Sequence, residues 1–236
     1  MEVITVVATQ TPRRPAVGLV PPADPALVRL LVVSASVVLV TVVAWLVVLI
    51  PAMPTGEVSE QLASLHEGMA VYRWGFVSAA FINPAFVVML YAASHVLASG
   101  PLRPHEMAGA LFIAAYWPLP TVAYVAQFAL LPRLLETPAA QVWYFGNPAS
   151  VSYWLAMTGY GLLGLGAILI VTRFLTGSAP AFGWLLLASG ATSTLGLVGY
   201  AVANDAVEFG STVGGALVVP LAVVALVAAG RRRGRR

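Results

Sequence analysis

The sequence predicts an all-α integral membrane bundle of six transmembrane helices, with a short extracytoplasmic amphipathic helix beside them. Hydrophobic residues make up 60% of the 236 residues and charged residues only 9%, whereas a soluble domain has about 25% charged residues. Mean hydropathy is +0.90. A helix needs about 20 apolar residues to cross the hydrocarbon core of a bilayer. Six stretches meet that length: 29–51, 74–98, 107–131, 150–173, 181–203 and 209–230.

These stretches divide the chain into three parts. Residues 1–28 are proline-rich, as in "TPRRPAVGLVPPADP", and are expected to be a disordered cytoplasmic segment. Residues 29–230 form one six-span transmembrane domain, and 231–236, "RRRGRR", form a basic cytoplasmic tail. The first apolar run is too long for a secretory signal, and no small-residue cleavage site follows it in "LIPAMPTGE". It is therefore expected to be a true span.

Arginine placement predicts the orientation of the bundle. With six spans both termini lie on one side, and ten of the twelve arginines then share that side. Only Arg73 and Arg133 fall in the opposite loops. Cytoplasmic loops favour arginine, so both termini are expected in the cytoplasm.

Composition and motifs exclude several kinds of chemistry. The chain has no cysteine, which excludes disulfides and thiolate catalysis, and no lysine, which excludes a Schiff base. The outer acids and His66 match no metal-ligand spacing, and no nucleotide or hydrolase motif occurs. No metal and no cofactor is therefore expected. The terminal arginines are interpreted as an orientation signal, so no nucleic-acid partner is expected.

The loop after the first span carries a helical pattern. Apolar residues from Val58 to Tyr72 recur at spacings of four, three, four and three, which predicts an amphipathic helix. Thr55 is its predicted N-cap. This helix either lies on the outer surface or extends the second span outward.

Four prolines lie near the middle of predicted spans. Pro118 and Pro120 occur in "YWPLPTVAYVAQF" of the third span, Pro84 in the second and Pro220 in the sixth. Proline removes a backbone donor and clashes with the preceding turn. Three helices are therefore expected to be weakened at similar depth.

Polar residues gather at that depth. Tyr116, Pro120, Tyr124 and Gln127 share one helical face, and polar residues of other spans lie level with them. The candidate ligand-binding residues are Asn83, Tyr116, Pro120, Tyr124, Gln127, Tyr160 and Thr192. They either line a midplane cavity between broken helices or only pack helices together. Packing is the simpler interpretation, because no charged residue accompanies them.

His95 is the titratable side chain found inside the predicted spans, about one turn from the cytoplasmic end. It is interpreted as a structural or interfacial group that bonds to Tyr91 or reaches toward Arg103, His105 and Glu106. Proton coupling is therefore disfavoured. The glycines of "MTGYGLLGLG" and of "GSTVG" (210–214) are expected to let helices approach closely within the bundle.

The run "WYFGNPASVSYWLAMTGYGLLGLGAILIVTRF", with "AYVAQFALLPRLL" before it, resembles a family of uncharacterised bacterial six-span membrane proteins, a domain of unknown function. The resemblance covers about residues 107–205. It implies a multi-pass protein of the bacterial plasma (inner) membrane and brings no reaction, ligand or catalytic residue with it.

The sequence thus predicts a non-enzymatic multi-pass membrane protein. Its partners are the lipid bilayer and, within the bundle, a lipid, a small apolar ligand or a partner protein. One alternative is a transporter of a neutral solute through a site at the proline-broken helices. A second is an intramembrane enzyme that uses His95 or the outer acids, which would require those groups to converge on one cavity.

Overall fold

The computed structural model describes residues 24–98 and 100–233. Within them, six helical units are long and apolar enough to cross a membrane, which confirms the predicted all-α, six-span class. The units are Pro25–Ala52, Val58–Val96, Pro104–Leu134, Val151–Ile170, Pro180–Ala201 and Asp205–Arg232. Most of the predicted N-terminal segment, and the last three residues of the predicted tail, lie outside the described residues.

Several spans are built from more than one helical piece. The first comprises α1 (Pro25–Ala44), a π turn η1 (Trp45–Leu49) and α2 (Ile50–Ala52), and the second is α3 (Val58–Val96). The third comprises α4 (Pro104–Tyr116), α5 (Pro118–Val125), η2 (Ala126–Leu130) and α6 (Leu131–Leu134). The loop helix α7 (Ala139–Trp143) leads to α8 (Val151–Ile170) and α9 (Thr172–Leu175), then to α10 (Pro180–Ala201). The last span comprises α11 (Asp205–Glu208), α12 (Gly210–Ala216) and α13 (Val218–Arg233).

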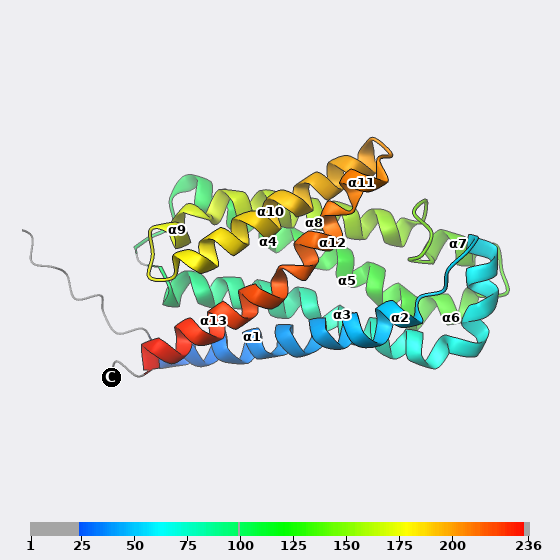
Figure 1. The fold of residues 1–236 in the computed structure, drawn as a ribbon, viewed down its shortest axis with the longest axis horizontal. Helices are drawn as coiled ribbons and strands as arrows, with labels where there is room; N and C mark the ends of the chain where they lie inside the picture. Colours follow the sequence, from blue (N-terminus) through cyan, green and yellow to red (C-terminus); the bar gives the residue numbers. More distant parts are fainter. Residues whose placement is uncertain (1–23, 99, 234–236) are drawn as a thin grey trace, which may run out of the picture.

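The chain runs back and forth between two ends of the bundle. α1 begins and α13 ends at the same end (Figure 1). We call this the arginine-rich end, because the helix termini and loops there carry Arg29, Arg103, Arg173, Arg231 and Arg232. The opposite end, with α7 and α11, is called the acidic end. The arginines thus separate as the sequence suggested, and which end faces the cytoplasm stays a prediction.

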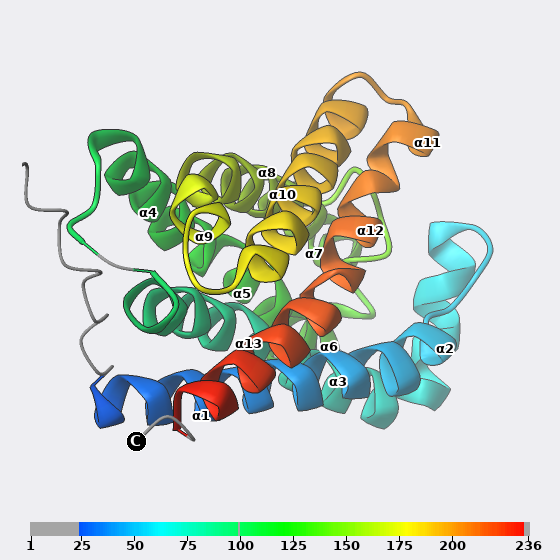
Figure 2. The same ribbon diagram turned by 60° about the vertical axis from the view of Figure 1, so that its left-hand side comes forward.

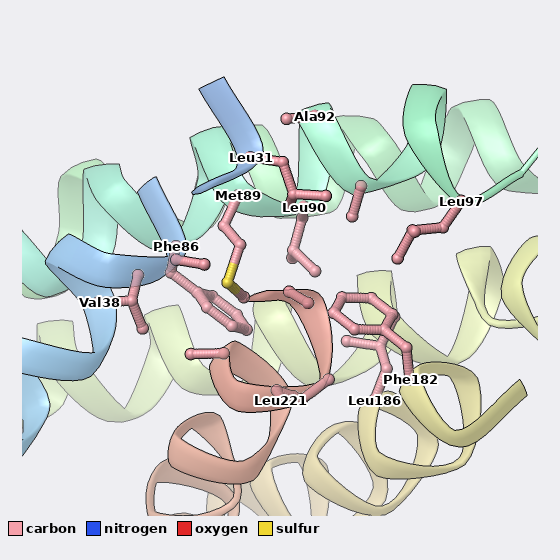
Figure 3. Packing of buried hydrophobic residues seen from close by; sticks show 14 of the residues in the cluster. Leu31, Val38, Phe86, Met89, Leu90, Ala92, Leu97, Phe182, Leu186 and Leu221 are labelled. Atoms are coloured by element: carbon pink, nitrogen blue, oxygen red, sulfur yellow. The ribbon is translucent and has the colours of Figure 1, made fainter. Parts of the chain in front are cut away.

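The larger apolar core joins α1, α3, α10 and α13 toward the arginine-rich end. The cluster includes the fully buried side chains of Leu31 in α1, Met89 in α3 and Leu221 in α13 (Figure 3). Phe182 of α10 is buried in the same cluster. In a bilayer, lipid tails are as apolar as leucine, so these contacts are favoured by close van der Waals packing and not by exclusion of water. This half of the bundle therefore holds the larger buried apolar cluster.

α8 lies in the middle of the bundle and packs against α4, α5 and α10. Glycine permits this close approach. A Cβ on Gly109 would lie 2.8 Å from the carbonyl oxygen of Gly166, and one on Gly164 would lie 2.6 Å from that of Gly190. The expectation that these glycines bring helices together within the bundle is confirmed.

The regular helix is interrupted near prolines in two spans and not in a third, and the backbone at both interruptions stays right-handed helical. The third span is interrupted at Trp117, directly before Pro118, and the sixth at Leu217, three residues before Pro220. α3, in contrast, runs without a break through Pro84, so any weakening there stops short of an interruption. A lone proline removes one hydrogen bond, and the 39 residues of α3 provide regular turns on both sides.

Two π turns were not predicted. In η1 the N–H of Ile50 reaches back five residues to the carbonyl of Trp45, and in η2 that of Leu131 reaches Ala126. Each turn lies directly before a helical segment whose second residue is proline, Pro51 or Pro132. A proline ring clashes with the carbonyl four residues earlier, and a wider turn makes room for it.

The predicted amphipathic helix is the first part of α3, so it extends the second span and does not lie apart from it. Leu62, Leu65 and Tyr72 of its apolar face are buried. The predicted N-cap, Thr55, is wrong. Glu57 caps the helix, and its N–H donates to the Glu60 carboxylate at 3.3 Å. A glutamate three residues into the helix completes this reciprocal arrangement, which Thr55 stands too early to make.

Candidate functional site

A cavity of about 150 Å³ lies between the six spans. Aromatic rings form much of its wall, and hydroxyl groups of α10 and α12 face them. The aromatic residues are Trp45, Phe86, Tyr116, Tyr124, Phe145, Tyr153 and Tyr160, and the hydroxyl residues opposite are Ser193, Ser211 and Thr212. Every described residue that lines the cavity is uncharged.

The cavity lies where the sixth span stops packing against the first span. α13 packs along α1, whereas α12 leans away from it and packs against α10 (Figures 1 and 2). Of the lining residues, Trp45 is half-buried and Thr212 of α12 is exposed. The cavity therefore reaches the lipid-facing surface near α12.

Four of the seven predicted ligand-binding residues line this cavity: Asn83, Tyr116, Tyr124 and Tyr160. The Tyr116 hydroxyl donates to Oδ1 of Asn83 at 2.6 Å, and the hydroxyls of Tyr124 and Tyr160 are hydrogen-bonded to each other. These pairs join three spans, α3, the α4–α5 unit and α8. Their rings and hydroxyls are thus held in place before any ligand enters.

Gln127 does not line the cavity and has a different role. Its amide oxygen accepts hydrogen bonds from the Tyr72 hydroxyl at 2.8 Å and from the backbone N–H of Phe145 at 2.9 Å. Its amide nitrogen donates to the Trp143 carbonyl at 2.8 Å and to Oγ of Ser152 at 3.0 Å. A glutamine amide has two donor hydrogens and an oxygen with two lone pairs. Gln127 therefore has no capacity left for a ligand.

Pro120 and Thr192 also lie outside the cavity wall. Pro120 packs against α8 at Gly159, where a Cβ would lie 2.6 Å from the proline Cδ. The Thr192 hydroxyl donates to the Ala188 carbonyl of its own helix at 2.8 Å. Both residues serve packing, as the simpler interpretation of these positions expected.

Phe145 links the Gln127 network to the cavity. Its ring lies 5.5 Å from that of Tyr124 and 5.6 Å from that of Tyr153, and it forms part of the wall nearest the acidic end. It comes from the loop between α7 and α8, and Gln127 holds its backbone N–H. The loop that closes this side of the cavity is thus fixed by one buried amide.

Trp45 is a site residue that sequence reasoning missed. Its indole Nε1 is buried and has no hydrogen-bond partner, and it is the single such side-chain atom among the described residues. Buried polar groups are almost always hydrogen-bonded, so an unpaired one at a cavity requires an explanation. The one sequence feature that could have drawn attention to Trp45 is Pro51, which follows the π turn that contains Trp45.

A buried ion pair lies at the arginine-rich end, apart from the cavity. Arg173 of α9 and Glu106 of α4 lie 3.6 Å apart, with side chains only 7% and 4% exposed. The Arg173 guanidinium also donates to the carbonyls of Ser94 at 3.1 Å and Gly100 at 2.9 Å. The sequence analysis did not predict this ion pair, and the structure uses it to lock α3, α4 and α9 together.

The remaining titratable groups are dispersed. His95 is exposed and its Nδ1 lies 2.9 Å from the Tyr91 carbonyl, as the structural interpretation expected. Asp205 and Glu208 lie at the acidic end, where Glu208 accepts a hydrogen bond from Tyr153. In residues 24–98 and 100–233, no three His, Asp or Glu side chains gather closely enough to hold a metal ion. An enzyme built on these groups would need them together, and they are apart.

Comparison with family models, with curated proteins and with solved structures gives no match. The six apolar helices define a multi-pass membrane protein in contact with the lipid bilayer. The resemblance to a bacterial six-span family stays a prediction.

Proposed function

We propose that this protein binds an uncharged, membrane-soluble amphiphile in the cavity between its six spans. The observation that carries the proposal is an uncharged cavity, open near α12, whose wall includes Trp45, the residue with the unpaired buried nitrogen. A ligand that resides in the membrane can reach such a cavity without crossing water. It is a lipid or a small apolar molecule, as the sequence suggested, with a hydrogen-bond acceptor.

The size of the cavity limits what enters it. An engineered cavity of about 150 Å³ in another protein holds one benzene ring, and the present cavity has the same volume. The ligand therefore inserts a ring or a short segment of chain and leaves the rest among the lipids. Aromatic walls favour such a group through offset and edge contacts.

The chemistry of the wall selects an uncharged ligand with an acceptor. Moving an ion into an apolar cavity without a partner is strongly unfavourable, and no charged side chain from the described part of the chain lines this one. Indole N–H is a donor only, so a ligand atom that pairs with Trp45 must be an acceptor, such as an ester or ketone oxygen. An unsatisfied buried donor costs about 1–3 kcal/mol, and a ligand that accepts its hydrogen removes that cost.

The two helix breaks favour a second function, transport of a neutral solute. The break at Trp117 directly follows Tyr116, and the break at Leu217 directly precedes Val218, both of which line the cavity. Broken helices around a midplane site are typical of transporters. Uptake into proteoliposomes that falls on Tyr116→Phe and Asn83→Ala would favour transport, and unchanged uptake would favour binding alone.

Native mass spectrometry of the full chain in nanodiscs tests the binding function. We expect a copurified ligand at one per chain in the wild type. Trp45→Phe, which keeps a ring and removes the donor, should release it. Trp184→Phe is the matched control, because Trp184 is 62% exposed on α10 and does not line the cavity. A wild-type protein that is bare at its sequence mass would contradict the proposal.

A further inference from the structure

A second hollow, of about 440 Å³, lies at the arginine-rich end. It is a groove between the first turn of α10 and the last turns of α13, which lie at the same end of the bundle (Figure 1). Its apolar lining includes Val223 and Val227 of α13 and Ala181 of α10, and the groove ends at Arg231 and Arg232. It shares no lining residue with the central cavity.

The groove changes from apolar to basic along its length. Val223, Val227 and Ala181 are exposed, so in a membrane they face lipid chains. Arg231 and Arg232 follow at the point where the apolar helix ends, which is where a bilayer passes from chains to headgroups. A lipid has the same order of parts, with its acyl chains in the hydrocarbon core and its headgroup at the membrane surface.

Among the described residues, the two arginines have no acidic partner. Arg173 and Glu106 form the one ion pair found among the described residues, so neither Arg231 nor Arg232 is neutralised by a carboxylate there. The positive charge at this end of the groove is thus available to an anion. Clusters of arginine beside membrane helices bind anionic lipid headgroups through this charge.

Arg232 is held in position before an anion binds. Its Nη2 donates to Oγ of Ser178 at 2.7 Å, and that hydroxyl donates in turn to the Leu97 carbonyl at 3.0 Å. A guanidinium has five N–H donors, and the structure uses one of them here. The remaining donors can meet two oxygens of one phosphate, which is the geometry that arginine favours.

The first turn of α10 adds a weaker attraction. α10 has 22 residues, and no side chain among the described residues caps its start at Ala179. Pro180 has no N–H and the Phe182 N–H donates to the Ala179 carbonyl at 3.0 Å, so the attraction comes mainly from the helix dipole, which is positive at this end. Ala179, Pro180 and Ala181 line the groove, so this positive helix end faces the same space as the arginines.

We propose that this groove binds an anionic phospholipid, with Arg231 and Arg232 on the headgroup phosphate and an acyl chain along Val223 and Val227. The exposed apolar wall selects a phospholipid over a soluble phosphate, because a soluble anion would leave that wall unused. This inference is independent of the central cavity and of the function proposed for it.

Competition between lipids tests the proposal. The full chain is placed in nanodiscs with equal amounts of phosphatidylglycerol and phosphatidylcholine, and the retained lipids are counted by native mass spectrometry. Each arginine near the surface contributes about fivefold in affinity for an anionic lipid. We expect Arg231→Gln/Arg232→Gln to abolish the preference for phosphatidylglycerol. Arg29→Gln/Arg103→Gln removes the same charge from exposed residues at the same end, outside the groove, and should keep it.

A second variant distinguishes binding in the groove from attraction to the arginine charges alone. Ala181→Trp fills the groove and keeps both arginines, so it should lower phosphatidylglycerol retention as strongly as the double substitution. Circular dichroism checks that each variant is folded. Equal loss in the Arg29/Arg103 control, or full retention in Ala181→Trp, would overturn the proposal. Displacement of the lipid from the wild type by inorganic phosphate would also overturn it, because the site would then be one for a soluble anion.

Discussion

Replacing Gln127 by leucine should destabilise the acidic end and loosen the cavity wall. Leucine has a similar size and no polar atom. The change leaves the Tyr72 hydroxyl and the Phe145 N–H without their acceptor, and both are enclosed by the helices around Gln127, which is itself fully buried. It also removes two donors from the Trp143 carbonyl and from Ser152.

The expected magnitude follows from those partners. Each buried donor left without a partner costs about 1–3 kcal/mol. Hydrogen bonds between membrane helices average about 0.6 kcal/mol, because the unfolded chain in a membrane also finds partners. Two stranded donors therefore predict a loss of about 1–6 kcal/mol in the free energy of unfolding. That is a large part of the total stability of about 5–15 kcal/mol of a typical domain.

Equilibrium unfolding in mixed micelles, with SDS as denaturant and tryptophan fluorescence as signal, measures the loss. Gln141→Leu is the control, because Gln141 is exposed on α7 and its side chain makes no hydrogen bond among the described residues. The folded fraction of Gln127→Leu should also retain less ligand, since Phe145 lines the cavity. Equal stability of the two variants would refute the role assigned to Gln127.

Three further predictions concern other parts of the bundle. Arg173→Met leaves Glu106 buried without its partner and should lower the unfolding free energy by about 3–5 kcal/mol. Adding Glu106→Gln removes the unpaired charge, so the double variant should lose less. A smaller loss in the single variant than in the double variant would contradict this. Gly164→Leu forces a side chain against the Gly190 carbonyl and should lower the folded yield on size-exclusion chromatography, whereas a wild-type profile would refute the packing. Burial raises the pKa of Tyr144, in the loop after α7, from 10.0 to about 12, so the unfolded chain ionises first. Stability should fall between pH 10 and 12, and Tyr144→Phe should flatten that slope of the melting temperature; an unchanged slope would argue against it.

Much of the fold could be predicted because it depends on local properties of the chain. Length and apolar composition located six spans, and the spacing of Leu62, Leu65 and Tyr72 located the buried face of α3. The depth of residues within their spans also predicted that Asn83 and Tyr116 lie at the same level, and both line the same cavity. Depth is readable from a sequence because every residue of a straight helix advances by the same 1.5 Å.

What could not be predicted depends on which spans are neighbours. Glu106 and Arg173 are paired because α4 and α8 pack side by side, which no local pattern reveals. Gln127 was predicted to bind a ligand because the sequence shows which helical face it lies on but not which residues it bonds to. Three of its hydrogen-bond partners, Trp143, Phe145 and Ser152, come from the loop and helix that follow. The unpaired nitrogen of Trp45 likewise becomes apparent only when every neighbour is in place.

The most direct test of ligand binding is to fill the cavity without disturbing the fold. Gly215 lines the cavity, and a Cβ there meets nothing within 4 Å. Gly215→Leu should therefore occupy the space of the ligand. Gly230→Leu is the control, because Gly230 lies in the same span, is equally unobstructed and is remote from the cavity wall.

Native mass spectrometry of both variants in nanodiscs gives the decisive comparison. If the cavity binds an amphiphile, Gly230→Leu keeps one ligand per chain and Gly215→Leu carries none. Equal ligand content in the two variants would contradict binding in this cavity.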